Sequence, residues 1–294
     1  MRMRNRNATS DFSKSMLPQN RREVFFDVLK IHWRKLLMLG VLFFVVFIPY
    51  FGLLWIGDAQ RLQIDGMSEQ MTQQQLQEAY YNLATFSNVR NAVALVWWLF
   101  FGVVMAGMSR VIRQYAWEEN VNFFSDFIKG IRDNAKSTMI LAFIVGLMVF
   151  MCSGTYHMIG FGPAYLPLIS AVQIVVALLV VFPVCAIWYA MIPLYQNTTV
   201  KYALFSFAVY LKSIIKTLIT LYACLIILVP VLLPMPYLHI IGLFIVSFLL
   251  PFVLLIWNLY SYCLFDAHIN PRYFPKLVGK GIPGKSENQE TDMK

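Results

Sequence analysis

Charged residues are scarce in this chain of 294 residues, because Asp, Glu, Lys and Arg together make up 13% of it. A water-soluble domain carries about 25% charged residues and about 45–50% apolar ones. Here the hydrophobic fraction is 59% and the mean hydropathy is +0.62. The composition therefore excludes a soluble enzyme, a disordered chain and a small secreted domain held by disulfides, and it indicates a membrane protein.

Motifs typical of catalytic or cofactor sites are also missing. The sequence contains no GxSxG, no glycine-rich phosphate loop and no HExxH. Its four cysteines and four histidines are spread along the chain, and no two cysteines form a CxxC pair. We therefore predict no metal site, no cofactor and no enzymatic activity, and we expect the cysteines to be buried apolar thiols.

Charge is absent altogether from four long stretches. These are the 22 residues between Lys35 and Asp58, the 19 between Arg90 and Arg110, the 64 between Lys136 and Lys201 and the 49 between Lys216 and Asp266. A membrane-spanning helix needs about 20 mostly apolar residues, so the first two stretches hold one span each and the others hold two each. Since no acid or base lies deep within a span, the sequence argues against an ion-coupled pump and against a voltage sensor.

The uncharged stretches predict an all-α fold, a polytopic membrane helical bundle with six transmembrane helices. Lipid offers the backbone no hydrogen-bond partners, so each span is expected to be helical. Gly and Pro residues at 160–163 divide the third stretch, and Pro234-Met235-Pro236 divides the fourth. The expected spans cover about residues 36–56, 92–110, 138–159, 166–192, 214–235 and 237–263.

The basic residues are distributed unevenly between the two sides of the predicted bundle. Of the 24 Lys and Arg residues, all but Arg61 and Arg90 fall in the N-terminal segment, the second and fourth loops or the C-terminal tail. The positive-inside rule then places both termini in the cytoplasm. The net charge of +9 follows from this asymmetry, so we expect the lipid bilayer as the partner and no nucleic acid.

Several segments outside the spans are expected to have distinct structures. The composition predicts three segments. Residues 1–20 are expected to form a flexible basic arm, residues 21–270 the six-span membrane domain, and residues 271–294 a disordered cytoplasmic tail. Apolar residues recur at helical spacing over 22–35, 122–137 and 199–212, which predicts three short amphipathic helices at the inner surface. Each of these helices is either an interfacial element or a surface on which a partner docks.

The first external loop, residues 57–91, is long and rich in Gln and in acids. Thr72 and Gln75 fit a capping box, which predicts a short external helix. A loop of this length usually has its own structure or a role. We expect the helix to lie over the outer mouth of the bundle, either as a lid for a ligand or as an inert insertion.

Neutral polar residues are the only chemically distinctive groups within the predicted spans. A channel or facilitator would use them to line a polar cavity, whereas in a closed bundle they bond between helices, which contributes about 0.6 kcal/mol on average. The candidates for cavity lining are Gln173, Thr220, Ser247 and Asn258.

Prolines and small residues predict where the spans bend and where they pack. Pro183, Pro230 and Pro251 are expected to kink three spans, because proline removes a helical hydrogen bond. Small residues four positions apart allow two helices to approach closely, and two such pairs occur, Gly102/Ala106 and Ala142/Gly146.

Three groups of short stretches carry a resemblance to a known family. They are Gly107-Met-Ser-Arg110 with Arg113 and Phe123-Phe124-Ser-Asp-Phe127, Phe182-Pro183 with Tyr195-Gln-Asn-Thr198, and Asn258-Leu-Tyr260 with Leu264-Phe265-Asp266-Ala-His-Ile-Asn270. These stretches resemble the YesL-type family of bacterial integral membrane proteins, from which the chain departs in its long first external loop. The resemblance implies a bacterial cytoplasmic (plasma) membrane. Because that family tends to occur near carbohydrate-uptake systems, it also implies an accessory role there, with a membrane transporter or another membrane protein as a partner.

Three functions are consistent with these observations. The first is a non-enzymatic accessory or regulatory protein associated with carbohydrate uptake. The second is a facilitator or channel for a neutral solute, and the third is a membrane-embedded enzyme acting on lipid.

Overall fold

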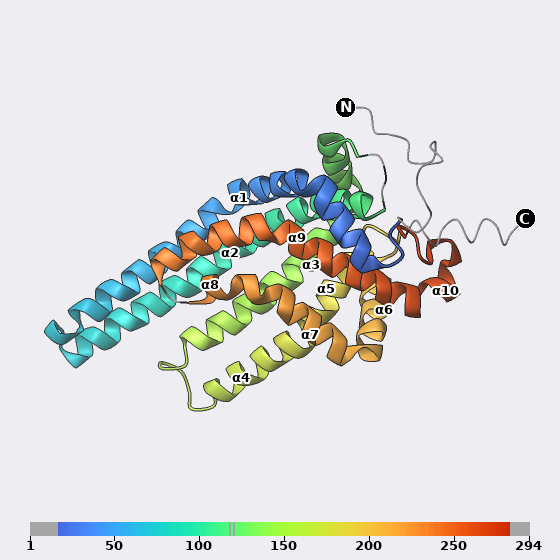
Figure 1. Ribbon diagram of the computed structural model, residues 1–294. Helices are drawn as coiled ribbons and strands as arrows, with labels where there is room; N and C mark the ends of the chain where they lie inside the picture. Colours follow the sequence, from blue (N-terminus) through green and yellow to red (C-terminus); the bar gives the residue numbers. More distant parts are fainter. Residues whose placement is uncertain (1–16, 118, 120, 234, 283–294) are drawn as a thin grey trace, which may run out of the picture.

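The computed structural model describes residues 17–117, 119, 121–233 and 235–282, and every regular element in these ranges is helical (Figure 1). Six helical stretches within them are long and apolar enough to cross a membrane. These stretches are Arg21–Gln70, Gln73–Ala116, Phe123–His157, Leu166–Met191, Ile214–Val231 and Pro236–His268. The prediction of an all-helical chain with six helices suited to span a membrane is confirmed.

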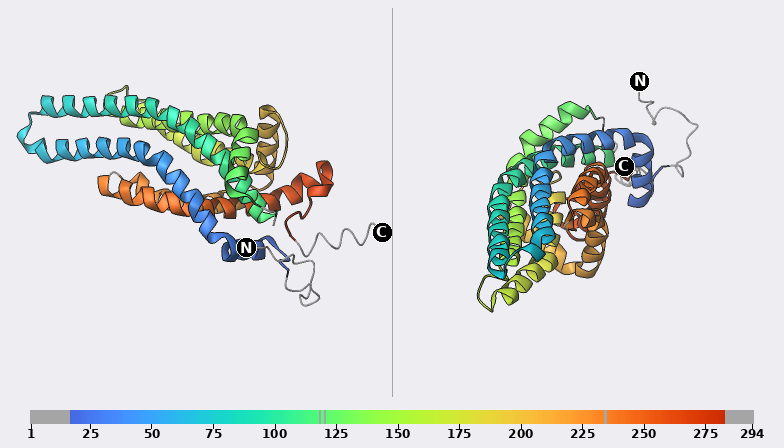
Figure 2. Two further views of the ribbon diagram at one scale, coloured as in Figure 1. Left: turned by 90° about the horizontal axis from the view of Figure 1, so that it is seen from above. Right: turned by 90° about the vertical axis from the view of Figure 1, so that its left-hand side faces the viewer.

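Four long helices make up most of the bundle: α1 (Arg21–Met67), α2 (Gln73–Ala116), α3 (Phe123–His157) and α9 (Pro236–His268). Helix α2 packs along α3, and α1 packs along both α9 and α2 (Figures 1 and 2). The largest fully buried side chains lie nearer the end of the bundle that holds the described chain ends, and they include Leu36, Leu39, Met108, Ile112, Ile187 and Leu255.

Two of the three predicted surface helices are not separate elements. The segment 22–35 is the first part of α1, and the segment 122–137 is the first part of α3. No Gly or Pro separates either segment from the apolar run that follows, so the backbone continues its helical hydrogen bonds without a break. Only the third prediction matches a distinct helix, α6 (Thr199–Lys212).

The expected external loop 57–91 is instead a helical hairpin. Helix α1 continues to Met67 and α2 begins at Gln73, with a 3₁₀ turn, η2 (Ser68–Gln70), between them. The predicted capping box is confirmed, since the Gln75 N–H donates to Thr72 Oγ1 at 3.3 Å and the Thr72 N–H donates to Gln75 Oε1 at 3.0 Å. The hairpin projects beyond the other helices (Figure 2).

The span that contains Pro183 consists of α4 (Leu166–Val176), a π-helical turn η3 (Ala177–Val181) and α5 (Phe182–Met191). Proline has no N–H to donate to the carbonyl four residues earlier, which here belongs to Leu179. The hydroxyl of Tyr210 donates to that carbonyl, and the hydroxyl of Tyr222 donates to the neighbouring carbonyl of Leu178. Side chains of α6 and α7 (Ile214–Leu225) thus satisfy the groups that the interruption leaves free.

The other two prolines interrupt their spans in different ways. Pro230 is the second residue of the short helix α8 (Val229–Leu232), which follows a 3₁₀ turn, η4 (Ile226–Leu228). Pro251 lies inside α9 and leaves the carbonyl of Ser247 without its helical donor. At that carbonyl α1 approaches so closely that a Cβ atom on Gly40 would lie 2.6 Å from the oxygen.

The predicted close packing of small residues is confirmed between α2 and α3. A Cβ atom on Gly102 would lie 2.7 Å from the Cα atom of Met139, and one on Gly130 would lie 2.8 Å from the carbonyl oxygen of Ala106. Further along the same pair of helices, Gly146 provides the space for the indole of Trp98. The two backbones therefore touch, which larger residues would prevent.

The described chain ends lie together at one end of the bundle. Arg21 forms an ion pair with Asp266, with 2.9 Å between Nη2 and Oδ2, and its Nη1 donates to the carbonyl of Lys280 at 2.7 Å. The expectation of disorder from residue 271 onward is wrong for residues 271–282, which include α10 (Asn270–Tyr273), η5 (Pro275–Leu277) and the buried Ile282. The remainder of the tail, 283–294, and residues 1–16 of the predicted arm lie outside the described residues.

Candidate functional site

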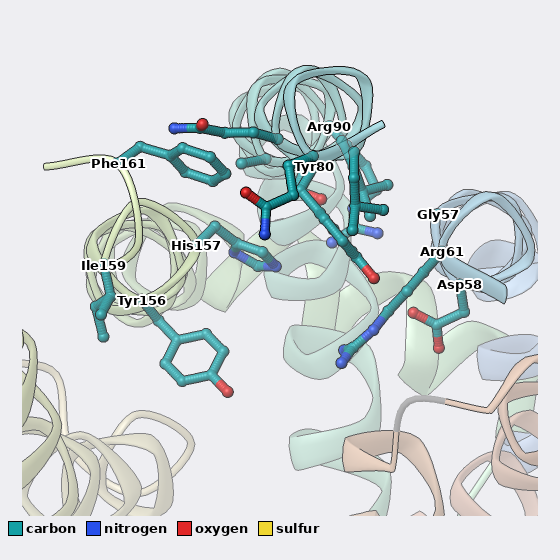
Figure 3. Close-up of a pocket in the computed structure, with 15 residues that line it drawn as sticks. Gly57, Asp58, Arg61, Tyr80, Arg90, Tyr156, His157, Ile159 and Phe161 are labelled. Atoms are coloured by element: carbon teal, nitrogen blue, oxygen red, sulfur yellow. The ribbon is translucent and has the colours of Figure 1, made fainter. Parts of the chain in front are cut away.

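A pocket of about 660 Å³ lies at the end of the bundle opposite the described chain ends, and Figure 3 shows the residues that line it. Three helices form its walls: the last turns of α1, the first part of α2, and the end of α3 with the loop that follows. We name it the outer pocket, after the side to which the charge count of the sequence assigns Arg61 and Arg90, and we define it by seven of its lining residues, Asp58, Arg61, Tyr80, Arg90, Tyr156, His157 and Phe161.

Contacts within the hairpin hold two walls of the outer pocket together. The hydroxyl of Tyr80 on α2 donates to Oδ1 of Asp65 on α1, and Arg61 lies one helical turn before Asp65 with 3.9 Å between its Nε and Oδ2. The ring of Tyr81 packs against Phe161 of the third wall, with 5.4 Å between the ring centroids. In Figure 3 the side chains of Arg61 and Tyr80 both reach toward the middle of the pocket.

Arg90 occupies the deep side of the pocket, where α1 and α2 approach each other. A Cβ atom on Gly57 would lie 2.3 Å from Nη1 of Arg90, so a larger residue at position 57 would shift the guanidinium from its place. Asp58 and Tyr50 are close enough to Arg90 to interact electrostatically. Among the described residues, however, Arg90 forms no ion pair within 4.0 Å, and its buried Nε has no hydrogen-bond acceptor.

The one carboxylate among the residues that line the pocket faces a histidine of another helix. Oδ2 of Asp58 lies 3.3 Å from Nδ1 of His239, which is 4% exposed at the start of α9. The other ring nitrogen, Nε2, lies 3.1 Å from the carbonyl oxygen of Val231. Two guanidinium groups, those of Arg61 and Arg90, and this one carboxylate line the pocket, so its wall carries a formal excess of one positive charge.

His157 is oriented by hydrogen bonds within its own helix. Nδ1 lies 2.6 Å from the carbonyl oxygen of Ser153, and since a carbonyl only accepts, Nδ1 carries the hydrogen. The Ser153 hydroxyl accepts in turn from Nδ2 of Asn91 at 2.8 Å, which links α3 to α2. The ring projects toward the middle of the pocket (Figure 3), so in the neutral imidazole Nε2 is left as an acceptor there.

None of the four polar residues predicted to line a cavity lines the outer pocket. Gln173 accepts a hydrogen bond at 2.7 Å from Thr155, which connects α4 to α3. Ser247 and Asn258 are fully buried in α9, and within the described part of the chain their side-chain polar atoms have no hydrogen-bond partner. Thr220 is half-buried in α7. That the four residues line a polar cavity stays a prediction.

Sequence reasoning missed the residues of the outer pocket, although one signal pointed toward them. Arg61 and Arg90 are the only two basic residues that the charge count assigns to the outer side. Because nearly thirty residues separate them in the sequence, it is not apparent there that they lie on the two adjacent helices of one hairpin, Arg61 on α1 and Arg90 on α2. Of the groups of His, Cys, Asp and Glu in the described residues, none has three members placed to hold a metal ion.

Several residues of the stretches that carry the family resemblance form contacts at the opposite end of the bundle. Arg113 donates to the carbonyl of Pro193 at 2.6 Å, the hydroxyl of Tyr195 donates to Oδ1 of Asn270 at 2.6 Å, and the amide of Asn270 donates to Asp266 at 2.7 Å. Burial and the nearby Asp266 raise the pKa of the Tyr195 hydroxyl, so it remains a donor. The cavity beside these groups has a volume of only about 10 Å³, so they form a structural clamp.

Comparisons of the chain with protein-family models, with curated proteins and with solved structures give no match.

Proposed function

We propose that the protein is a non-enzymatic, multi-pass protein of the bacterial cytoplasmic membrane that binds a polar solute in the outer pocket. It would act as an accessory or regulatory protein associated with carbohydrate uptake. The observation that carries the proposal is the outer pocket itself, which combines charged groups with aromatic walls at one end of six membrane-suited helices. Pockets that bind small molecules have this character, with apolar walls and a few polar groups that fix orientation.

A sugar-like ligand fits the residue types of the pocket. The rings of Tyr80, Tyr156 and Phe161 offer flat apolar faces, and Gln73 and Gln77 add amide groups that both donate and accept hydrogen bonds. The charge asymmetry supports an orientation in which the outer pocket faces away from the cytoplasm. The accessory role itself rests on the resemblance to the YesL-type family.

The packing inward of the pocket favours a receptor over a channel. Phe43, Phe47 and Phe51 of α1 form a buried cluster with Leu243 and Val246 of α9. This apolar cluster occupies the outer half of the bundle, where a path for a neutral solute would continue inward. A facilitator would need to open it, and a flux assay in liposomes with a panel of neutral sugars would detect that activity.

The geometry around His157 argues against a hydrolase at this site. Ser153 is its nearest hydroxyl, at 3.2 Å from Nδ1, but that nitrogen is hydrogen-bonded to the carbonyl of the same serine. It therefore cannot accept the serine proton as the base of a nucleophilic pair does.

Ligand binding is testable on the full-length protein in phosphatidylcholine nanodiscs. A panel of neutral and acidic sugars is added, and thermal unfolding is followed, because a ligand that binds only the folded state raises the unfolding temperature. We expect at least one sugar to raise it in the wild type and in Tyr165→Ala, an exposed tyrosine outside the pocket, but not in Tyr156→Ala. If no sugar has an effect, the proposal fails.

The accessory role has a separate test. The tagged protein is purified from native membranes in mild detergent, and co-purifying proteins are identified by mass spectrometry. We expect a membrane transporter for a carbohydrate above the background of an unrelated six-span protein. Its consistent absence would contradict the role while leaving solute binding to be judged on its own assay.

A further inference from the structure

The outer pocket has more positive than negative charge on its walls. Two arginines and one aspartate line it, and Oδ2 of that aspartate, Asp58, lies 3.3 Å from the buried His239 of α9. Arg61 has one acidic neighbour, the exposed Asp65 at 3.9 Å, and Asp65 also accepts the hydroxyl hydrogen of Tyr80. A pair of exposed charges at that distance contributes little, so Arg61 is available to a ligand.

Arg90 is the stronger indication. A guanidinium has five N–H donors, and leaving such donors unpaired in a partly buried place is costly. No described residue accepts a hydrogen bond from Arg90, and its Nε is buried. The glycine at position 57 gives the guanidinium room beside the backbone of α1, at the wall of the pocket. An acceptor with negative charge inside the pocket would satisfy these donors.

We propose that the ligand of the outer pocket carries an oxyanion, a carboxylate or a phosphate, which the guanidinium groups of Arg90 and Arg61 bind. The remainder of the ligand lies against the rings of Tyr80 and Tyr156, and Nε2 of the neutral His157 accepts a hydrogen from a hydroxyl group. Guanidinium groups suit this task because their planar donors match both oxyanions. The inference rests on the proposed function, since it specifies the chemistry of the solute bound there.

Two sources could present such a group at this position. One is a soluble acidic sugar from the aqueous side, and the other is the headgroup of an anionic lipid, because the pocket lies where the apolar parts of α1 and α2 end. The two sources share the oxyanion and differ in whether the bilayer supplies it. Separate arms of one experiment distinguish them.

The first arm uses the full-length protein in nanodiscs of phosphatidylcholine alone, titrated with D-glucose, D-glucuronate and D-glucose 6-phosphate by calorimetry. The second arm compares thermal unfolding in these nanodiscs with unfolding in nanodiscs that also contain phosphatidylglycerol. Each arm includes the wild type, Arg90→Gln and Arg132→Gln, which removes the same charge from an exposed site at the opposite end of the bundle. Gly57→Ala is added because it displaces the guanidinium of Arg90 without changing any charge.

We expect an acidic sugar to bind at least about tenfold more tightly than glucose, a ratio that one charge-assisted interaction supplies. We expect Arg90→Gln and Gly57→Ala each to weaken that binding about tenfold or more, and Arg132→Gln to leave it unchanged. Unfolding temperatures without ligand show whether each variant is folded. If Arg90→Gln does not fold, Gly57→Ala and Arg61→Gln decide the question.

Three other results have definite meanings. If glucose binds as tightly as the acidic sugars, the oxyanion inference is overturned while the proposed solute-binding function stands. If no sugar binds but phosphatidylglycerol stabilises the wild type and not Arg90→Gln, the oxyanion inference stands with lipid as its source, and the proposed function falls. If neither sugars nor phosphatidylglycerol have an effect, both are overturned.

Discussion

Individual side chains compensate for interruptions in the helices of this protein. Pro183 leaves the carbonyl of Leu179 without its helical donor, and the hydroxyl of Tyr210, from a different helix, donates to it. Within a membrane neither water nor lipid can replace that donor. A proline in a span is visible in the sequence, but the tyrosine that compensates for it is recognisable only once the helices are placed.

Replacing Tyr210 by Phe is expected to lower stability by about 0.5–2 kcal/mol, because the ring is kept and the hydrogen bond is lost. Tyr165→Phe is the matched control, since Tyr165 is 62% exposed. Chemical unfolding of both variants in detergent micelles measures the difference. Equal stabilities would show that the hydroxyl of Tyr210 contributes nothing.

Substitution by alanine is expected to have opposite effects on stability at two glycines of the spans, Gly102 and Gly52. A Cβ atom on Gly102 would meet backbone atoms of α3 at 2.7–2.9 Å, whereas one on Gly52 would meet nothing within 4 Å. We expect Gly102→Ala to destabilise the protein by about 1–3 kcal/mol through overpacking. Gly52→Ala should stabilise it by about 0.5–1 kcal/mol, because alanine favours a helix more than glycine does. Thermal unfolding that moves in the same direction for both variants would contradict this account of the α2–α3 contact.

At the scale of elements, the hairpin between α1 and α2 determines where the candidate site lies. The sequence contains its local signal, the Thr72 and Gln75 capping box, and that prediction is confirmed. The apolar run ends near residue 57 and predicts the end of the helix there, yet α1 continues to Met67. Polar residues such as Gln, Glu and Arg are good helix formers, so polarity marks the edge of the membrane and not the end of the helix.

Removing the tip of the hairpin should abolish ligand binding without unfolding the rest of the protein. We expect a variant in which a short Gly-Ser linker replaces residues 62–80 to lose only the helical signal of the removed residues and to keep an unfolding temperature within a few degrees of the wild type. It should lose ligand binding, because Tyr80 and the wall around Leu76 and Gln77 are gone. Circular dichroism and calorimetry provide the two measurements. If this variant binds the ligand as tightly as the wild type, the binding site is not the outer pocket.

At the scale of the whole molecule, the two ends of the described chain are tied together by a partly buried ion pair. Arg21 is 9% exposed and Asp266 is 20% exposed, and Asn270 and Tyr195 extend the network. The sequence placed both segments on the same side of the membrane but treated residues after Asn270 as disordered. A contact between residues 245 positions apart cannot be inferred from local composition, so the sequence alone does not predict the ordered structure of residues 271–282.

Asp266→Asn is expected to destabilise the protein by about 1.5–3 kcal/mol, since it removes the acceptor charge that faces Arg21. Asp133→Asn removes a carboxylate from the more exposed pair with Arg110 and should cost less than about 1 kcal/mol. Urea unfolding of the two variants, together with Arg21→Gln and the Arg21→Gln/Asp266→Asn double variant, measures the coupling. Strict additivity of the double variant would show that the pair is not coupled.

The overall architecture was predictable because it depends on sums over long segments. The lengths of the uncharged runs predict six spanning helices, and Gly and Pro residues indicate where two of the runs are divided. The outer pocket was not predictable, because it requires Arg61, Arg90 and His157 to converge from three helices whose lengths beyond the apolar runs were unknown. The four polar residues that were singled out instead lie in α4, α7 and α9, apart from it.

The central claim is that the outer pocket and the hairpin face away from the cytoplasm while the clamped chain ends face it. Its most direct test is labelling of single cysteines in intact cells with a membrane-impermeant maleimide, in a background where Cys152, Cys185, Cys224 and Cys263 are replaced by Ala. The account predicts labelling of Gln74→Cys, an exposed position near the tip of the hairpin, and labelling of Lys129→Cys, exposed at the opposite end, only after the membrane is permeabilised. Labelling of Lys129→Cys but not of Gln74→Cys in intact cells would contradict it.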